Sequence, residues 1–212
     1  DIVYAAALGH TYGPQQERGV YKTTDGGDTW ERIFFVDENT GAAELAMDPE
    51  NPDRLLVGMW SIHINTWGLN SGGPGGGVYR TLDGGSTWEP LSKNGLPGGK
   101  DHPVGKTAVA IAHSSPNVVY ALFEIDSPAL YRSEDFGDTW TLQTRNHDIA
   151  ERAPYYTRMA VSTEDPNELY FASVKFSISK DGGKTIESGY SAGGDNHDIW
   201  VDPTNADRLM VA

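Results

Sequence analysis

The sequence predicts an all-β fold built from repeated four-stranded units. Three observations lead to this prediction. An eight-residue pattern of acids, glycines and hydroxyl side chains occurs four times in 212 residues. Each copy lies between two short runs rich in β-branched and aromatic residues, as expected for two strands joined by a turn. Helical periodicity is almost absent, whereas the turn formers glycine (25 residues) and proline (12 residues) are frequent.

The eight-residue pattern predicts a β-hairpin with a tight acidic turn, because an apolar run precedes and follows each copy. The aspartates of successive copies are 58, 52 and 46 residues apart. We call the four copies the acidic turns. They read TTDGGDTW (23–30), TLDGGSTW (81–88), SEDFGDTW (133–140) and SKDGGKTI (179–186).

A second hairpin belongs to each unit and precedes the acidic turn. Its turn contains Asp-Pro or Ser-Pro with a nearby Asn. These residues indicate a turn because proline presets φ and asparagine tolerates turn conformations. Each unit therefore has strands A to D, with the proline-containing turn between A and B and the acidic turn between C and D. Four strands per unit and a repeat near 50 residues predict the blades of a β-propeller. The A–B hairpins span 43–59, 108–123, 159–173 and 197–212.

The acidic turns are predicted to stabilise the fold. The aspartate can accept N–H groups within its own turn, the second glycine permits a positive φ, and the tryptophan can pack between neighbouring sheets. Four near-identical copies favour this role over a calcium loop or a catalytic acid. The fourth turn departs from the pattern, with Ile186 in place of tryptophan. The residues concerned are Asp25, Gly27, Trp30, Asp83, Gly85, Trp88, Asp135, Gly137, Trp140, Asp181 and Gly183.

Charge and composition exclude several classes of partner. The formal net charge of −14 disfavours nucleic acid and anionic membrane surfaces, which need clustered Lys and Arg. The absence of cysteine excludes disulfides and thiolate metal sites. No apolar run is long enough to insert into a membrane. No metal-binding spacing is seen, and we expect neither a metal nor a cofactor.

The order of strands predicts a section of a propeller with about four blades. Strand A is missing from the first unit, and the last unit has only strands A and B, which gives 17 strands. Because propellers close with whole blades, we expect the remaining blades to belong to the same polypeptide. The alternative is a four-bladed ring with a spare strand. The units are approximately 1–36, 37–92, 93–144, 145–189 and, in part, 190–212.

Strand order also predicts which face of the propeller carries function. The A–B and C–D turns share one face and are short and alike, whereas the B–C and D–A connections share the other face and are long and different. Function usually resides on variable loops held by a rigid scaffold, so we expect the working face to lie opposite the acidic turns. The glycine-rich segment 71–77 lacks the features of a phosphate loop. The variable loops are 9–18, 60–77, 92–106, 144–158 and 189–198.

Aromatic, histidine and acidic residues gather in these loops, which suits sugars and also peptides. Such a site predicts a glycan or peptide ligand. The candidate ligand-binding residues are His10, Tyr12, Trp60, His63, Trp67, His102, His147, Tyr155, Tyr156 and His197.

The triplet Asn-His-Asp occurs at 146–148 and 196–198, and Lys-Asp-His occurs at 100–102. The triplets fit acid/base chemistry or an oxygen and nitrogen metal site. Local capping of loops, in which Asp and Asn accept nearby N–H groups, is the favoured interpretation. Glycoside hydrolysis would need two carboxyl groups about 5 to 10 Å apart. The candidate catalytic acids are Asp101, Asp148, Asp195 and Asp198.

The acidic turns resemble the Asp-box, or BNR repeat, of sialidases, sortilin-type receptors and xyloglucan-active glycoside hydrolases, all of which are β-propellers. The chain is most similar to bacterial sortilin-like BNR-repeat proteins labelled glycosyl hydrolases. The stretches that carry this similarity are YAAALGHTYGPQQERGVYKTTDGGDTWE, WGLNSGGPGGGVYRTLDGGSTW and DNHDIWVDPTNADRLMV. An Asp-box indicates a fold far more strongly than a function.

The resemblance implies a secreted protein or one of the periplasm or cell envelope. It favours a recognition or scaffold module that binds peptide or glycan, with part of a glycoside hydrolase as the alternative. A sialidase is disfavoured because the arginine motif of that family is not seen. The catalytic aspartates of xyloglucan-active enzymes cannot be assigned to positions here.

Overall fold

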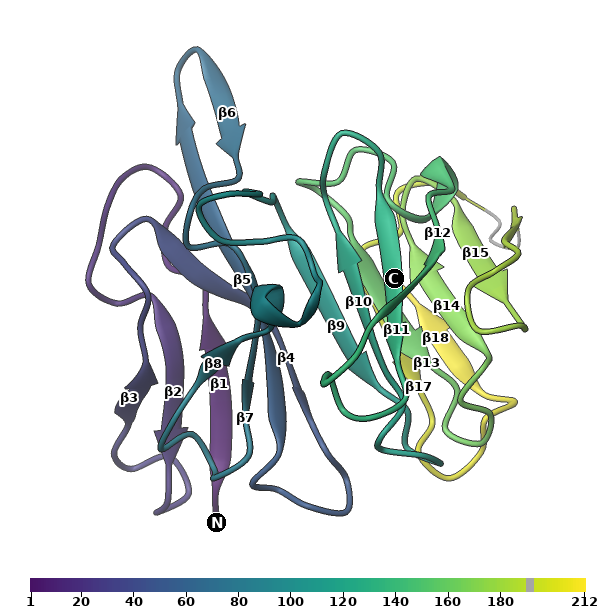
Figure 1. Cartoon of the computed structure of the whole chain (residues 1–212), viewed down its shortest axis with the longest axis horizontal. Coiled ribbons are helices and arrows are strands. Elements are labelled where there is room, and N and C mark those ends of the chain that lie inside the picture. The colour runs from purple at the N-terminus through teal and green to yellow at the C-terminus, as the bar shows by residue number, and fades with distance from the viewer. Residues whose placement is uncertain (190–192) are drawn as a thin grey trace.

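The computed structural model describes residues 1–189 and 193–212. In these residues eighteen strands form antiparallel sheets that stand side by side (Figure 1). The inner strands of successive sheets adjoin one another in chain order. This arrangement confirms the predicted β-propeller section of about four blades.

The first two blades form the purple and blue part of Figure 1. The first has the strand order β1 (Val3–Ala7), β2 (Gly19–Thr23), β3 (Glu31–Phe34). The second has the order β4 (Thr40–Met47), β5 (Leu55–Asn65), β7 (Gly77–Thr81), β8 (Glu89–Pro90). A short extra strand, β6 (Gly68–Ser71), pairs with the end of β5. The prediction that 60–77 is a loop is therefore wrong, because its first half forms a hairpin.

The third and fourth blades are complete four-stranded sheets. The third has β9 (Thr107–Ile111), β10 (Val119–Phe123), β11 (Ala129–Ser133) and β12 (Thr141–Thr144). The fourth has β13 (Arg158–Val161), β14 (Leu169–Ala172), β15 (Phe176–Ser179) and β16 (Glu187–Ser188). The hairpin β17 (Ile199–Val201) and β18 (Leu209–Val211) follows. Two 3-10 helices, η1 (Leu91–Asn94) and η2 (His147–Ile149), interrupt the D–A connections.

The hydrophobic core lies between successive blades. Both faces of a middle blade are covered, so its second strand is apolar throughout, as in β10, where all five residues are buried. Three clusters of buried side chains fill the spaces between the first and second, second and third, and third and fourth blades. Burial of these faces is the main force that holds the blades together.

Each acidic turn is closed by its own aspartate. In the second turn Asp83 Oδ1 accepts bonds from Thr81 Oγ1 (2.8 Å) and Thr87 N (2.9 Å), and Oδ2 accepts one from Thr87 Oγ1 (2.7 Å). The other three turns repeat these bonds. Bonds from Thr87 and Thr81 lower the pKa of Asp83 to about 2, because they stabilise the ionised carboxylate.

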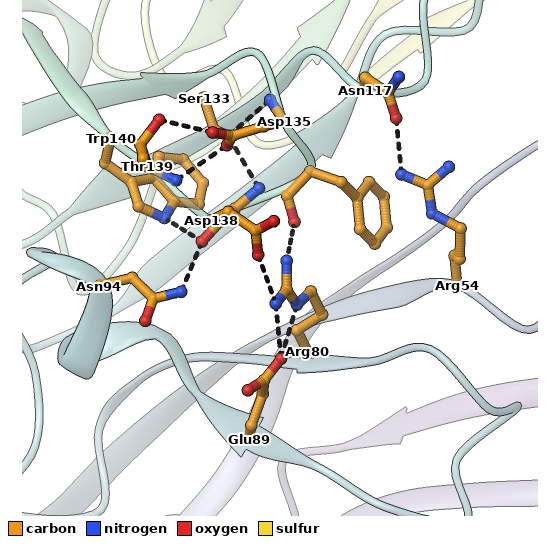
Figure 2. A network of polar contacts seen from close by, with 12 residues as sticks. Arg54, Arg80, Glu89, Asn94, Asn117, Ser133, Asp135, Asp138, Thr139 and Trp140 are labelled. Atoms are coloured by element: carbon orange, nitrogen blue, oxygen red, sulfur yellow. Dashed lines mark hydrogen bonds and ion pairs between the residues drawn. The ribbon is translucent and has the colours of Figure 1, made fainter.

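A basic residue of the preceding blade holds each of the second and third acidic turns. Lys22 Nζ donates to Gly84 O (2.9 Å), and Arg80 Nη1 donates to Phe136 O (2.7 Å). Arg80 also contacts Glu89 (2.6 Å) and Asp138 (2.8 Å), as Figure 2 shows. Gly84 and Phe136 each directly follow the aspartate of their turn. The basic residue therefore binds the carbonyl at the equivalent position of both turns.

The amide of that same residue binds the A–B turn of its own blade. Gly84 N donates to Asp53 O and Phe136 N to Asn117 O, both at 2.9 Å. Phe136 has a φ of 56° where the other turns have glycine. Its ring lies 3.7 Å from the Arg54 guanidinium carbon, and Arg54 Nη2 also donates to Asn117 (2.9 Å; Figure 2). The turn residue is therefore fixed from two blades at once.

The acidic-turn tryptophans are not equivalent. Trp88 stacks on Phe34 of the first blade with ring centroids 4.9 Å apart, and Trp140 packs in the cluster between the second and third blades. Trp30 is 45% exposed. Among the described residues Trp30 belongs to none of the three clusters between blades, so its packing between sheets stays a prediction.

Candidate functional site

Two adjoining cavities lie at the end of the sheets opposite the acidic turns. The larger, about 700 Å³, is lined by residues 71–74, 100, 103–105 and 124–126. The smaller, about 200 Å³, is lined by residues 37, 39, 61–63, 70 and 72–74. Segment 72–74 forms a wall of both. A further cavity of about 420 Å³ lies beside the acidic turns of the third and fourth blades, where its polar side chains already hold those turns.

Glu124 is the best-ordered acid of the larger cavity. It directly follows β10, and its Oε2 accepts bonds from Ser71 Oγ (2.5 Å) and Lys106 N (2.7 Å). Its backbone N–H donates to Lys106 O (2.9 Å). Asp126 lines the same cavity and is exposed. The cavity thus presents one fixed and one solvated carboxyl group two residues apart.

Trp60 supports this cavity from inside the blade. It was predicted to contact ligand, but it lies in β5 and is only 4% exposed. Its Nε1 donates to Ser71 Oγ (2.8 Å), the hydroxyl that in turn binds Glu124. The indole is therefore a supporting group, because the backbone continues as a strand where a loop was expected.

Lys106 joins the third blade to the connection that precedes the fourth. Its ammonium group is largely buried and donates to the backbone oxygen of Tyr156. Burial, followed by the positive charge of Arg158, lowers the pKa of Lys106 to about 8. The ammonium also lies 5.6 Å from the centre of the Trp60 ring. One buried cation thus links the larger cavity to the Tyr156 segment.

Glu44 and Arg158 form an ion pair between the inner strands of the second and fourth blades. Arg158 Nη1 lies 3.2 Å from Glu44 Oε1. Glu44 Oε2 is buried and accepts no hydrogen bond from the described residues. Burial raises the pKa of Glu44 to about 7, against the opposing effect of Arg158. Sequence reasoning missed this pair, although a charged residue within an apolar strand such as 43–47 was a usable signal.

A second group of predicted residues does come together. Tyr156 is buried and donates its hydroxyl proton to Asp195 Oδ1, and His197 Nε2 lies 3.6 Å from the same oxygen. The rings of Tyr156 and His197 are 5.0 Å apart, and Tyr155 beside them is 59% exposed. These residues come from two D–A connections. Residues 190–192 of the predicted loop 189–198 lie outside the described residues.

The backbone around this group is strained. Arg152, Thr157 and Asp195 have φ values of 51°, 59° and 75°, a region that side chains other than glycine seldom adopt. Such conformations persist only where the surroundings enforce them. Here the Lys106 and Asp195 contacts hold the segment in place.

The remaining Asn-His-Asp residues hold local structure. Asn146 caps η2 by accepting a bond from Asp148 N (2.9 Å). Asp148 accepts bonds from Ser188 Oγ (2.9 Å) and Lys175 Nζ (3.2 Å), and these two bonds lower its pKa. Asp198 accepts a bond from Ile199 N (2.9 Å). Asn146 and Asp198 thus accept nearby N–H groups, as the capping interpretation expects, whereas Asp148 binds side chains that are distant in sequence. The contacts given for the two triplets do not join them into one site.

The other candidates lie on the same face, and all of them except the half-buried His63 are exposed. Asp101 and His102 lie in a turn between two residues of the larger cavity, Lys100 and Pro103, and His147 lies on η2. His63 lines the smaller cavity. His10 and Tyr12 belong to the 9–18 loop, which the buried Arg18 anchors by donating to His10 O (2.8 Å) and Asn39 O (2.8 Å). Trp67, at the tip of the β5–β6 hairpin, is 91% exposed.

The described residues form no group of three or more side chains able to hold a metal ion. Nor does any helix among them have the length and apolar character needed to cross a membrane. The loop-rich face offers carboxylates, amides, histidines and exposed aromatic rings.

Comparison with known proteins agrees with the fold. No family model matches the chain. The chain is a β-propeller section: the solved structure of an ancestral GH74 enzyme matches 96% of it and 26% of that protein, with a TM-score of 0.62 and 14% identity. TolB from Acinetobacter baumannii matches 98% of it and 46% of that protein, with a TM-score of 0.60 and 10% identity. At these identities both likenesses show the fold alone.

In sequence the chain is similar to a xyloglucanase of a Paenibacillus species, at 26% identity over 148 residues. The match covers 68% of this chain but only 13% of that enzyme. The chain thus corresponds to a small part of its curated relative. Together the comparisons support a β-propeller section related to glycoside hydrolases.

Proposed function

We propose that the loop-rich face binds a neutral polysaccharide. The observation that carries the proposal is the pair of cavities on either side of segment 72–74. Carboxyl groups line the larger cavity, and Asn39, His63 and Asn70 line the smaller one. Acids and amides suit the hydroxyl groups of a sugar, whose ring faces are apolar. The net charge of −14 disfavours an anionic ligand by Coulomb repulsion.

The proposal favours recognition of a polysaccharide over its hydrolysis. The four acids predicted for catalysis do not line one cavity in the described chain: Asp148 is engaged with Lys175 and Ser188, and Asp195 with Tyr156. A recognition role also agrees with the resemblance to Asp-box, sortilin-like proteins. A polysaccharide ligand would suit a secreted or cell-envelope protein. The proposal favours glycan over peptide because of the similarity to a xyloglucanase.

Hydrolysis is a second candidate function, which one observation favours. Glu124 and Asp126 line the same cavity, and a pair of carboxyl groups is what glycoside hydrolysis requires. The chain matches only 13% of the curated xyloglucanase. Hydrolysis of xyloglucan by the whole protein is therefore proposed here as well. Mass spectrometry of sugars released from plant and bacterial polysaccharides tests it.

Isothermal titration with xyloglucan, mixed-linkage β-glucan and the anionic polymer polygalacturonate tests the binding proposal. We expect binding of a neutral polymer, none of polygalacturonate, and about a tenfold loss of affinity in Asp126→Asn, the size of one lost hydrogen bond to a charged group. Asp148→Asn is the matched control and should bind as the wild type does. Failure of both neutral polymers to bind would overturn the proposal.

A further inference from the structure

Among the described residues, the β5–β6 hairpin is an addition that the second blade has and the other blades lack. β5 has 11 residues, whereas its counterparts β10 and β14 have five and four. The additional residues pair with β6 in the register His63↔Asn70, Ile64↔Leu69 and Asn65↔Gly68. In Figure 1 the hairpin projects beyond the loop-rich end of the sheets. Its tip places Trp67 almost entirely in solvent, at 91% exposure.

Stability does not account for this hairpin. Ordering each backbone residue opposes folding by about 1–2 kcal/mol, and the tip residues Asn65, Thr66, Trp67 and Gly68 are all exposed. None of the four belongs to the hydrophobic clusters between blades. The tip is nevertheless ordered, because Asn65 Oδ1 accepts bonds from Trp67 N (2.9 Å) and Gly68 N (3.0 Å). An ordered tip that buries nothing indicates a contact outside the chain.

The hairpin is continuous with the smaller cavity. His63 and Asn70, which face each other across its base, both line that cavity. On the other edge of β5, Ile64 N donates to Thr11 O (2.7 Å). This bond places the hairpin beside the loop that carries Tyr12, which is 74% exposed. Two exposed aromatic residues therefore stand on adjoining segments next to the proposed site.

Aromatic side chains suit the apolar ring faces of sugars because they supply a large, rigid contact area at low entropic cost. The strand part of this path, from position 63 to the end of β5 at position 65, is roughly 7 Å at about 3.3 Å per residue, and the tip lies beyond it. A ligand that fills the cavity and reaches the tip must extend over that length.

We propose that the β5–β6 hairpin is a stacking arm on which Trp67 binds the extended part of a polysaccharide chain whose neighbouring sugars occupy the cavities. The inference rests on the proposed function and sharpens it, since it makes a polymer the preferred ligand over a short oligosaccharide. Tyr12 contributes a second, weaker contact on the adjoining loop.

The test compares polymer and oligosaccharide binding in matched tryptophan variants. Isothermal titration of xyloglucan and of a cellulose-derived tetrasaccharide is carried out with the wild type, Trp67→Ala, Trp67→Phe and Trp200→Ala. Trp200 is the control because it is also exposed, at 48%, but lies in β17. We expect Trp67→Ala to weaken polymer binding about tenfold, within the range for loss of an aromatic contact. The tetrasaccharide affinity should stay unchanged, Trp67→Phe should restore part of the loss, and Trp200→Ala should match the wild type.

The outcomes separate the two proposals. If the wild type binds xyloglucan and Trp67→Ala binds it equally well, the arm has no role and the proposed function stands. If neither xyloglucan nor mixed-linkage β-glucan binds the wild type, the proposed function itself fails. If Trp67→Ala loses affinity for a protein partner and none for glycans, the arm is a protein contact and the inference is overturned.

Discussion

The two ends of the sheets follow opposite rules. At the acidic-turn end the same bonds recur in four blades, with Asp25, Asp83, Asp135 and Asp181 in equivalent places. At the other end the described connections differ in length and sequence. The two cavities, the Ser71–Glu124 contact and the β5–β6 hairpin do not recur from blade to blade there. The side chains that repeat in every acidic turn stabilise the repeated blade. The side chains that could bind a ligand lie in the connections that differ between blades.

The first acidic turn shows what a neighbouring blade contributes. Its glycines, Gly26 and Gly27, are exposed, whereas Gly84 and Gly85 of the second turn are buried. The aspartate accepts the same hydrogen bonds in both turns. The difference lies in the covering side chains, Lys22 and Ile33 of the first blade. Matched substitutions in the two turns therefore separate local closure from packing between blades.

The largest effect is expected for the arginine between the second and third blades. Arg80→Ala removes a buried side chain that binds Phe136 O, Glu89 and Asp138. We expect it to lower the free energy of unfolding by about 2–4 kcal/mol, because a buried carbonyl loses its partner. Lys22→Ala, at the equivalent half-buried position, should lower it by about 1 kcal/mol. Urea unfolding of both variants measures the difference, and equal losses would contradict the packing explanation.

An effect of similar size is expected for the second glycine of the acidic turn. Gly85 and Gly27 have φ values of 92° and 108°, so alanine at either position costs about 1 kcal/mol in backbone strain. A Cβ at Gly85 would also overlap the Ile33 side chain, whereas at Gly27 the nearest atom is Trp30 Nε1, 4.0 Å away. Overpacking should add about 1–3 kcal/mol in Gly85→Ala alone. Thermal unfolding compares the two variants, and identical midpoints would show that Ile33 moves aside freely.

The acidic turns also predict a dependence of stability on pH. The folded pKa of Asp83 is about 2, below the ordinary value near 3.9, so the unfolded chain binds more protons in this range. The contribution of Asp83 is complete above about pH 4 and is lost as the pH falls towards 2. We expect the thermal midpoint to fall across this window, and less steeply in Asp83→Asn. An unchanged slope in that variant would assign acid sensitivity to other groups.

The sequence predicted the features that repeat in every blade. It missed features that depend on contacts found beside one or two blades. Four aligned copies revealed the blades, the turn chemistry and the face that carries the variable loops. Trp60 was placed in a loop because β5 continues past the predicted A–B hairpin: Trp60 pairs with Gly41 of β4, and residues 62–65 pair with β6. Glu124 was missed because its connection is short, although the bonds from Ser71 and Lys106 give it a fixed position. Separations between loop residues depend on packing between blades, which no local pattern encodes.

The smallest effect on stability is expected for an aspartate at the loop-rich end of the sheets. Comparing it with an aspartate at the acidic-turn end gives the sharpest contrast between the two ends. Asp126→Asn changes an exposed side chain of the larger cavity, so the free energy of unfolding should stay within about 0.5 kcal/mol of the wild type. Its xyloglucan affinity should fall, because the carboxylate would accept a sugar hydroxyl. Asp83→Asn should do the reverse, since its carboxylate closes a turn on the opposite face: thermal stability falls and affinity is retained. Calorimetric scans give the thermal stability of both variants, and titrations give their affinities for xyloglucan. Loss of affinity in Asp83→Asn at a temperature where it is fully folded would show that the two ends are coupled, and that the blades transmit strain from the turns to the loops.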